Sequence, residues 1–201
     1  MRTRARVLLL VLMHTACTTT MQEPTVPENL AELPAIIREG AFRAVIEIPA
    51  GSVDKQQYDP ATKSFPVDLR NGEPRRITFL PYPANYGFIP GTRMDKGLGG
   101  DGDALDVFVL CGALPSGTIL EVEVIGIIEL LDAGERDDKL VALPLDPSLR
   151  TMEASDITEL PEAARTILVA WLLNYDPDDG AELIAVKGRQ EAMTTATRWR
   201  K

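Results

Sequence analysis

The sequence predicts an α+β fold in which a small closed barrel of short strands is flanked by two C-terminal helices. Segments with strand-like alternation fill the middle of the chain, whereas helical spacing of apolar residues appears only after residue 157. Proteins in which a run of strands precedes a run of helices typically adopt α+β architectures. Closing the strands into a barrel would also remove sheet edges at which other chains could pair.

Six segments have the composition and alternation of strands. They are residues 44–49, 65–69, 76–80, 105–110, 119–131 and 139–143. Asn71-Gly72, a pair favoured in tight turns, lies between the second and third segments and predicts a hairpin there. In the fifth segment Glu121 and Glu123 alternate with valines, so one face of that strand is expected to contact water.

Two helices are predicted near the C-terminus. Thr158 is suited to cap the first, and Pro161 is suited to its first turn. Apolar residues then recur at helical spacing until the helix ends before Asp176-Pro177. The second helix is expected over residues 188–200.

The N-terminal residues resemble a targeting segment. Three arginines precede a short apolar run at residues 7–13, and Cys17 follows a small residue, as at a bacterial lipoprotein processing site. Residues 1–17 are therefore expected to be a signal peptide with lipidation at Cys17, and plain signal cleavage nearby is the alternative. Residues 18–41 are rich in Thr, Glu and Pro, which predicts a tether, and residues 42–201 would form one folded domain. The expected location is the periplasm or a membrane-anchored lipoprotein.

Composition excludes several classes of function. The net charge of −9 argues against a nucleic acid as partner. The single histidine, His14, lies in the predicted signal, so a histidine base, a histidine metal site and a Ser-His-Asp triad are excluded from the mature chain. Cys111 would be the one cysteine left after removal of residues 1–17, which excludes a disulfide framework.

An acidic cluster lies at the mouth of the strand predicted at residues 105–110. Asp101, Asp103 and Asp106 stand among glycines, and their mutual repulsion requires a nearby positive charge. Oxygen-only ligands favour a hard divalent cation, Mg²⁺ first and Mn²⁺ or Ca²⁺ after it. An EF-hand is excluded because Gly112 would occupy the twelfth position, where a bidentate Glu is required. Taken alone, the cluster favours a structural loop or a generic cation site.

Four further elements accompany the acidic cluster in a distinctive order. They are Glu47 in the first strand, the run Pro-Ala-Asn-Tyr-Gly-Phe-Ile-Pro at residues 83–90, the run Asp-Ala-Gly-Glu-Arg-Asp-Asp-Lys at residues 132–139, and Asn174-Tyr175. Each residue has an ordinary structural explanation when it is considered singly. Together, over residues 45–175, they resemble the soluble family I inorganic pyrophosphatases.

The resemblance implies a five-stranded OB-like barrel flanked by helices and an inorganic diphosphatase activity. Such enzymes hydrolyse pyrophosphate to two phosphates with several Mg²⁺ ions, and Mn²⁺ is an alternative. Two metal ions about 3.5–4 Å apart can bind both the attacking and the leaving oxygen and lower the pKa of water. The resemblance also implies a homo-oligomer, a hexamer in bacterial relatives.

Residue roles follow from the matching positions. The implied metal residues are Asp101, Asp106, Asp132, Asp137 and Glu47, with Glu47 acting through water. Asp103 would take the proton from the metal-bound water. The implied substrate-binding residues are Lys55, Arg75, Tyr86, Lys139 and Tyr175, of which Lys55, Arg75 and Tyr86 also belong to the catalytic set with Asp103.

The chain departs from the family pattern on the phosphate side. Gln57 stands where a carboxylate is usual, and Asp176 follows Tyr175 where a lysine is usual. A negative charge there should weaken anion binding. An alternative function is therefore a non-catalytic or weakly active envelope-anchored module that binds phosphate or cations. Arg70 and Arg76 compete with Arg75 for the phosphate-binding role.

Overall fold

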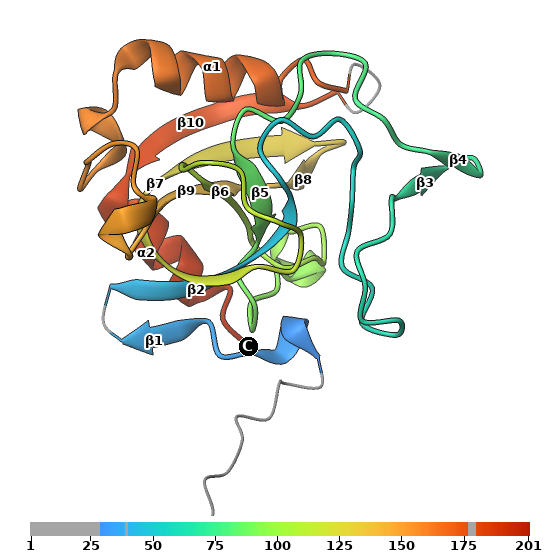
Figure 1. Ribbon diagram of the computed structural model, residues 1–201, viewed down its shortest axis with the longest axis horizontal. Coiled ribbons are helices and arrows are strands. Elements are labelled where there is room, and N and C mark those ends of the chain that lie inside the picture. The colour runs from blue at the N-terminus through green and yellow to red at the C-terminus, as the bar shows by residue number, and fades with distance from the viewer. Residues whose placement is uncertain (1–28, 39, 177–179) are drawn as a thin grey trace, which may run out of the picture.

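Five strands close into a ring in the computed structural model, which describes residues 29–38, 40–176 and 180–201 (Figure 1). The strands are β2 (Ala41–Ile48), β5 (Asn85–Phe88), β6 (Asp106–Val109), β9 (Lys139–Pro144) and β7 (Ile119–Asp132). Each pairs with the next in this order, β6 and β9 being parallel, and β7 pairs back onto β2. The predicted five-stranded arrangement is thereby confirmed. The predicted signal peptide and Cys17 lie outside the described residues.

Shorter elements extend this ring. They are β1 (Ile36–Arg38), β3 (Leu69–Arg70), β4 (Glu73–Pro74), β8 (Glu135–Arg136), β10 (Glu182–Gly188) and the 3-10 helices η1 (Leu30–Glu32), η2 (Lys96–Leu98), η3 (Pro147–Leu149) and η4 (Ile157–Glu159). The two predicted helices are confirmed as α1 (Glu162–Leu172) and α2 (Arg189–Arg198). Within the described ranges, none of the helices combines the length and apolarity needed to cross a membrane.

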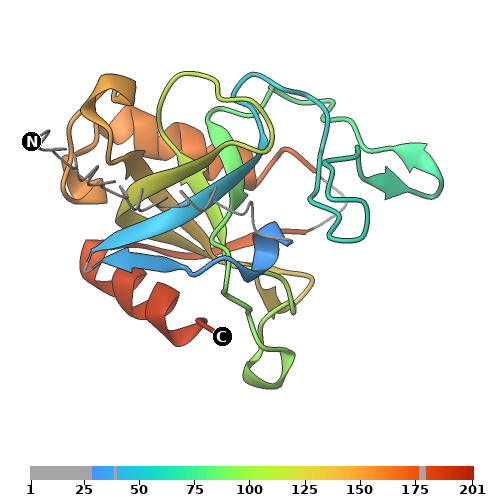
Figure 2. The same cartoon turned by 60° about the horizontal axis from the view of Figure 1, so that its bottom comes forward.

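The predicted hairpin around Asn71-Gly72 is present but much shorter than expected. Both turn residues have positive φ, 56° and 84°, as a tight two-residue turn requires. Only β3 and β4 pair across it, so the prediction of strands at residues 65–69 and 76–80 was wrong in extent. Figures 1 and 2 both show this hairpin projecting away from the barrel, where it has no sheet to extend its pairing.

The ordered chain extends into the segment that the sequence assigns to the tether. β1 pairs antiparallel with β2, Ile36 lying opposite Phe42. Leu33 and Ala35 are buried, at 9% and 3% exposure. Burial of these apolar side chains offsets the entropy of ordering the strand.

Two apolar clusters lie on opposite faces of the barrel strands. Val107 and Val109 of β6 belong to one cluster, together with Ala192 of α2, whereas Phe108 belongs to the other, together with Trp171 of α1. This alternation follows from the two-residue period of a strand. The two helices therefore pack against opposite faces of the barrel strands.

Gly87 permits the close approach of β5 to β2. A Cβ atom at this position would lie 1.9 Å from the carbonyl oxygen of Val45, a distance that no side chain tolerates. β5 was not among the predicted strands, because its four residues are flanked by proline-containing loops and lack strand-like alternation. Its neighbour Tyr86 is thereby held at the barrel wall.

Candidate active site

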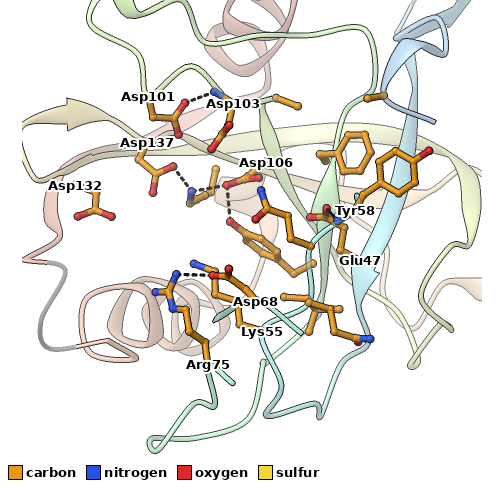
Figure 3. Close-up of a pocket in the computed structure, with 18 of the residues that line it drawn as sticks. Glu47, Lys55, Tyr58, Asp68, Arg75, Asp101, Asp103, Asp106, Asp132 and Asp137 are labelled. Atoms are coloured by element: carbon orange, nitrogen blue, oxygen red, sulfur yellow. Dashed lines mark hydrogen bonds and ion pairs between the residues drawn. The ribbon is translucent and has the colours of Figure 1, made fainter. Parts of the chain in front are cut away.

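All eleven predicted site residues line one cavity of about 620 Å³. They are Glu47, Lys55, Arg75, Tyr86, Asp101, Asp103, Asp106, Asp132, Asp137, Lys139 and Tyr175. Figure 3 shows Asp101, Asp103, Asp132 and Asp137 on one side of this cavity, and Lys55 and Arg75 on the other. The cavity thus has an acidic half and a basic half.

The acidic half is assembled by two turns that lie next to each other. Ala133 and Gly134 form a two-residue turn with φ of 49° and 86°, which places Asp132 at the end of β7. The Arg136 amide donates to the carbonyl oxygen of Gly99 at 2.8 Å. This bond holds the Asp101 loop beside the β7–β8 hairpin, and so carboxylates far apart in sequence face one another.

Lys139 is the central cation of the acidic half. β6 and β9 pair in parallel with Asp106 opposite Lys139, and the Lys139 ammonium donates to Asp106 Oδ2 at 2.6 Å. The same ammonium forms an ion pair with Asp137. The Tyr86 hydroxyl donates to Asp106 Oδ2 at 2.5 Å. Burial would lower the pKa of Lys139, but the charges of Asp106 and Asp137 raise it overall, so the group stays protonated.

The carboxylates around Lys139 repel one another in a partly dehydrated site. Burial raises the pKa of Asp101 to about 6, and the neighbouring carboxylates add to that rise, whereas a hydrogen bond from the Asp103 amide opposes it. That bond measures 2.9 Å to Asp101 Oδ1. Burial also raises the pKa of Asp106, against the influence of Lys139 and Tyr86. Such a site favours any bound cation that reduces the repulsion.

Glu47 lies apart from the other carboxylates, on β2. Its side chain is only 7% exposed, and Oε1 accepts a hydrogen bond from the Tyr58 amide at 2.7 Å. Burial raises its pKa to about 8, an effect that the Tyr58 bond only partly opposes. A buried carboxyl of this kind can release or hold a proton near neutral pH.

Arg75 is the arginine that reaches the cavity. Its Nη1 donates to Asp68 Oδ2 at 3.0 Å and its Nη2 to Asp176 Oδ2 at 2.8 Å. Arg76 instead points to solvent with 68% of its side chain exposed and pairs with Asp54. Arg70 does not line the cavity but bonds Asp176. The structure thus separates three arginines that sequence reasoning left undecided.

Sequence reasoning missed Asp68, which lines the cavity and bonds Arg75. Backbone bonds hold its segment in place: the Asp68 amide donates to the Lys55 carbonyl at 2.7 Å, and the Arg75 amide to the Asp68 carbonyl at 2.8 Å. No local pattern marks Asp68, because its role depends on this pairing between three separate stretches of the chain.

An aromatic stack connects α1 to the cavity, and it too was missed. The ring of Tyr175 lies 4.5 Å from that of Trp171 and nearly parallel to it, and Tyr82 packs 4.5 Å from Trp171 on another side. Tyr82 in turn contacts Tyr86. The indole N–H of Trp171 donates to the Leu80 carbonyl at 2.8 Å. Tyr86 and Tyr175 are therefore supported in the cavity by aromatic packing.

Within the described part of the chain, no group of three carboxylates is placed to hold one metal ion together. The Lys139 ammonium lies between Asp106 and Asp137 and supplies the compensating charge. The donor set nevertheless fits a hard cation, because every candidate ligand is a carboxylate that faces the same cavity. The residues present are compatible with Mg²⁺ and offer no nitrogen or sulfur ligand for a softer metal.

Comparison with known proteins places this chain in a family. The model of the inorganic pyrophosphatase family matches residues 44–201. The chain is 35% identical over 150 residues to the inorganic pyrophosphatase of Sulfolobus acidocaldarius, covering 72% of this chain and 79% of that one. It is 37% identical over 149 residues to that of Saccharolobus solfataricus, covering 71% and 78%.

Solved structures agree. The inorganic pyrophosphatase from Thermus thermophilus superposes with a TM-score of 0.74 at 27% identity, covering 85% of this chain and 96% of that one. The enzyme from Neisseria gonorrhoeae superposes with a TM-score of 0.70 at 30% identity, covering 85% and 97%. Family match, sequence identity and fold therefore point the same way. The chain belongs to the inorganic pyrophosphatase family and is an inorganic diphosphatase.

Proposed function

We propose that this chain hydrolyses pyrophosphate to two phosphates in the cavity described above, with Mg²⁺ as its metal. The observation that supports this assignment is the division of one cavity into an acidic and a basic half, built from segments that span residues 47–175. Pyrophosphate carries several negative charges, so it requires cations on both sides of the scissile bond.

The acidic half would hold the metal ions. Asp101, Asp106, Asp132 and Asp137 would be ligands, and Glu47 would act on a further ion through water. When bound, the ions lower the pKa of water and neutralise the phosphoryl oxygens. Metal dependence is general in this family, and Mn²⁺ is the alternative ion. Lys139 would then turn from its carboxylate partners toward the phosphate.

Asp103 is proposed to accept the proton of the attacking water. It faces the cavity from the loop that precedes β6, and its side chain is exposed enough to exchange that proton with solvent. Lys55, Arg75, Tyr86, Lys139 and Tyr175 would bind the two phosphoryl groups. Of these, Arg75 and Lys55 would stabilise the charge that develops on the departing phosphate.

Measurement of phosphate release tests this function. The chain from residue 18 onward should release phosphate from pyrophosphate when Mg²⁺ is present and lose that activity in EDTA. Asp103→Asn should lower the rate by about 10²–10⁴-fold, the usual contribution of a general base. Asp95→Asn is the matched control, because Asp95 is a carboxylate that caps η2 in the same loop without lining the cavity. Binding of pyrophosphate without turnover would instead favour the non-catalytic phosphate-binding module.

We further propose that the protein is exported and lipid-anchored. The pattern of residues 1–17 supports export, and Cys17 is the proposed lipidation site. Fractionation of cells that express the chain, compared with a Cys17→Ser variant, tests this. Recovery of both forms in the same fraction would contradict the anchor. We also propose a homo-oligomer, a hexamer as the family resemblance implies, and sedimentation of the purified protein tests it.

A further inference from the structure

Asp176 binds two arginines at once. Its Oδ2 lies 2.8 Å from Nη2 of Arg70 and 2.8 Å from Nη2 of Arg75, and its Oδ1 accepts from Nη1 of Arg70 at 3.1 Å. The Asp176 side chain is only 12% exposed. Two-point contact with a guanidinium in a partly dehydrated position is the strong form of this interaction.

Arg75, Asp176 and Arg70 differ in their position relative to the cavity. Arg75 lines the cavity, whereas Asp176 and Arg70 do not. Asp68 binds Nη1 of Arg75 while Asp176 binds Nη2, so carboxylates hold both ends of the planar guanidinium. A guanidinium fixed in this way loses little entropy when it binds phosphate.

The charges around Arg75 would be unfavourable for an anion without Arg70. Asp68 and Asp176 place two negative charges on one guanidinium, which would weaken its attraction for phosphate. Arg70 adds a positive charge directly to Asp176 and offsets one of them. The acidic residue at position 176 is thus accompanied by a cation that lies 106 positions away in the sequence.

We propose that Asp176 and Arg70 are positioning residues for the phosphate-binding Arg75. Asp176 orients the Arg75 guanidinium, and Arg70 offsets the negative charge that Asp176 brings. Together, Arg70 and Asp176 would support phosphate binding in place of the lysine that usually follows Tyr175 in the family pattern. This inference rests on the proposed function, because it assigns Arg75 to the phosphate side.

A double-mutant cycle tests the inference. The purified chain and its Arg70→Met, Asp176→Asn and doubly substituted variants are compared. Calorimetry with imidodiphosphate, a non-hydrolysable pyrophosphate analogue, measures affinity in the presence of Mg²⁺, and steady-state kinetics with pyrophosphate measure KM and kcat. Arg76→Met is the matched control, since Arg76 lies in the same segment but pairs with Asp54 outside the cavity. Asp176→Glu keeps the charge and checks for a merely structural loss.

Arg70→Met should weaken imidodiphosphate binding and raise KM by about five- to tenfold with kcat nearly unchanged, as expected for coupled charges in contact. In the Asp176→Asn background the same change should have an effect below about twofold, because the charge that Arg70 offsets is absent. Asp176→Glu should preserve the sensitivity to Arg70→Met.

Equal effects of Arg70→Met in both backgrounds, or an effect no larger than that of Arg76→Met, would overturn the inference. Its failure is distinguishable from failure of the proposed function. Turnover of pyrophosphate without coupling rejects only the positioning roles, whereas coupling in analogue affinity without turnover rejects only the hydrolysis. Absence of both analogue binding and pyrophosphate turnover in the unsubstituted chain rejects both.

Discussion

Replacement of Lys139 by methionine should destabilise the metal-free protein severely. The Lys139 side chain is 5% exposed, and its partners Asp106 and Asp137 are 23% and 19% exposed. Methionine keeps the length of the side chain but leaves two carboxylates facing each other without a cation. Removing one partner of a buried ion pair costs about 3–5 kcal/mol of unfolding free energy. For a domain of this size that corresponds to a fall in Tm of about 6–20 °C.

Mg²⁺ should reverse much of this loss. Metal ions bound by the same carboxylates would supply the missing positive charge, and a ligand at 100 times its Kd stabilises a folded protein by about 2.7 kcal/mol. Thermal unfolding followed by circular dichroism, in EDTA and in a Mg²⁺ series, gives both quantities. The increase in Tm per step of Mg²⁺ should be larger for Lys139→Met than for the unsubstituted chain, where the ammonium competes for the carboxylates.

Lys96→Met provides the matched control, because Lys96 is an exposed lysine of η2 and forms no ion pair with the carboxylates of the cavity. It should leave Tm unchanged under both conditions. A Tm for Lys139→Met within about 2 °C of the unsubstituted chain in EDTA would refute the reasoning, since a loss of 1 kcal/mol already shifts Tm by about that much. Equal stabilisation of Lys139→Met and the unsubstituted chain by Mg²⁺ would refute competition between the ammonium and the metal, and no stabilisation of either would refute the assignment of these carboxylates to metal.

Three further predictions concern the scaffold. Gly87→Ala should cost about 3 kcal/mol or more in urea unfolding, because its methyl group would overlap the Val45 carbonyl; a loss below 1 kcal/mol would contradict the close packing. Asp156→Asn should lower stability at pH 7 by about 0.3–1 kcal/mol, because the carboxylate accepts the Arg189 amide at the start of α2. Hydrogen bonds from the Thr158 amide and then the Arg189 amide lower the folded pKa of Asp156 below its usual 3.8. The difference should therefore persist above pH 3.8 and vanish as the pH falls through the lowered value, and a pH-independent difference would exclude the charge as its source. Trp171→Phe should cost about 1–3 kcal/mol by leaving a backbone carbonyl without its indole partner, with KM little changed because the stacked ring is kept; a large rise in KM would show that the indole itself positions the substrate side.

Most of the order of strands and helices follows from local patterns in this chain, but β10 was not among the predicted strands and lies between α1 and α2. Alternation at the start of residues 119–131 and helical spacing after residue 157 indicate a buried face, because side-chain direction repeats every two residues in a strand and every 3.6 residues in a helix. The middle of β7 is instead buried on both faces, because other parts of the fold cover it on each side. The acidic cluster of Asp101, Asp103 and Asp106 was recognisable from its spacing, whereas the other predicted cavity residues were implied by the family resemblance. Strand β5 was not predicted, because its pairing depends on Gly87 fitting closely against β2, which is a contact between distant segments.

What the local pattern could not provide is the pairing of charges across the fold. From the sequence, Asp176 is simply an acidic residue that is expected to weaken phosphate binding. The folded chain places it between Arg70 and Arg75, more than 100 positions away, where its charge is offset and its carboxylate orients a guanidinium. In the same way the parallel register of β6 and β9 places Lys139 between Asp106 and Asp137. Electrostatic energy depends on the distance between charges in space, and strand pairing determines that distance. The sequence therefore shows which residues are charged but not which charged residues they contact.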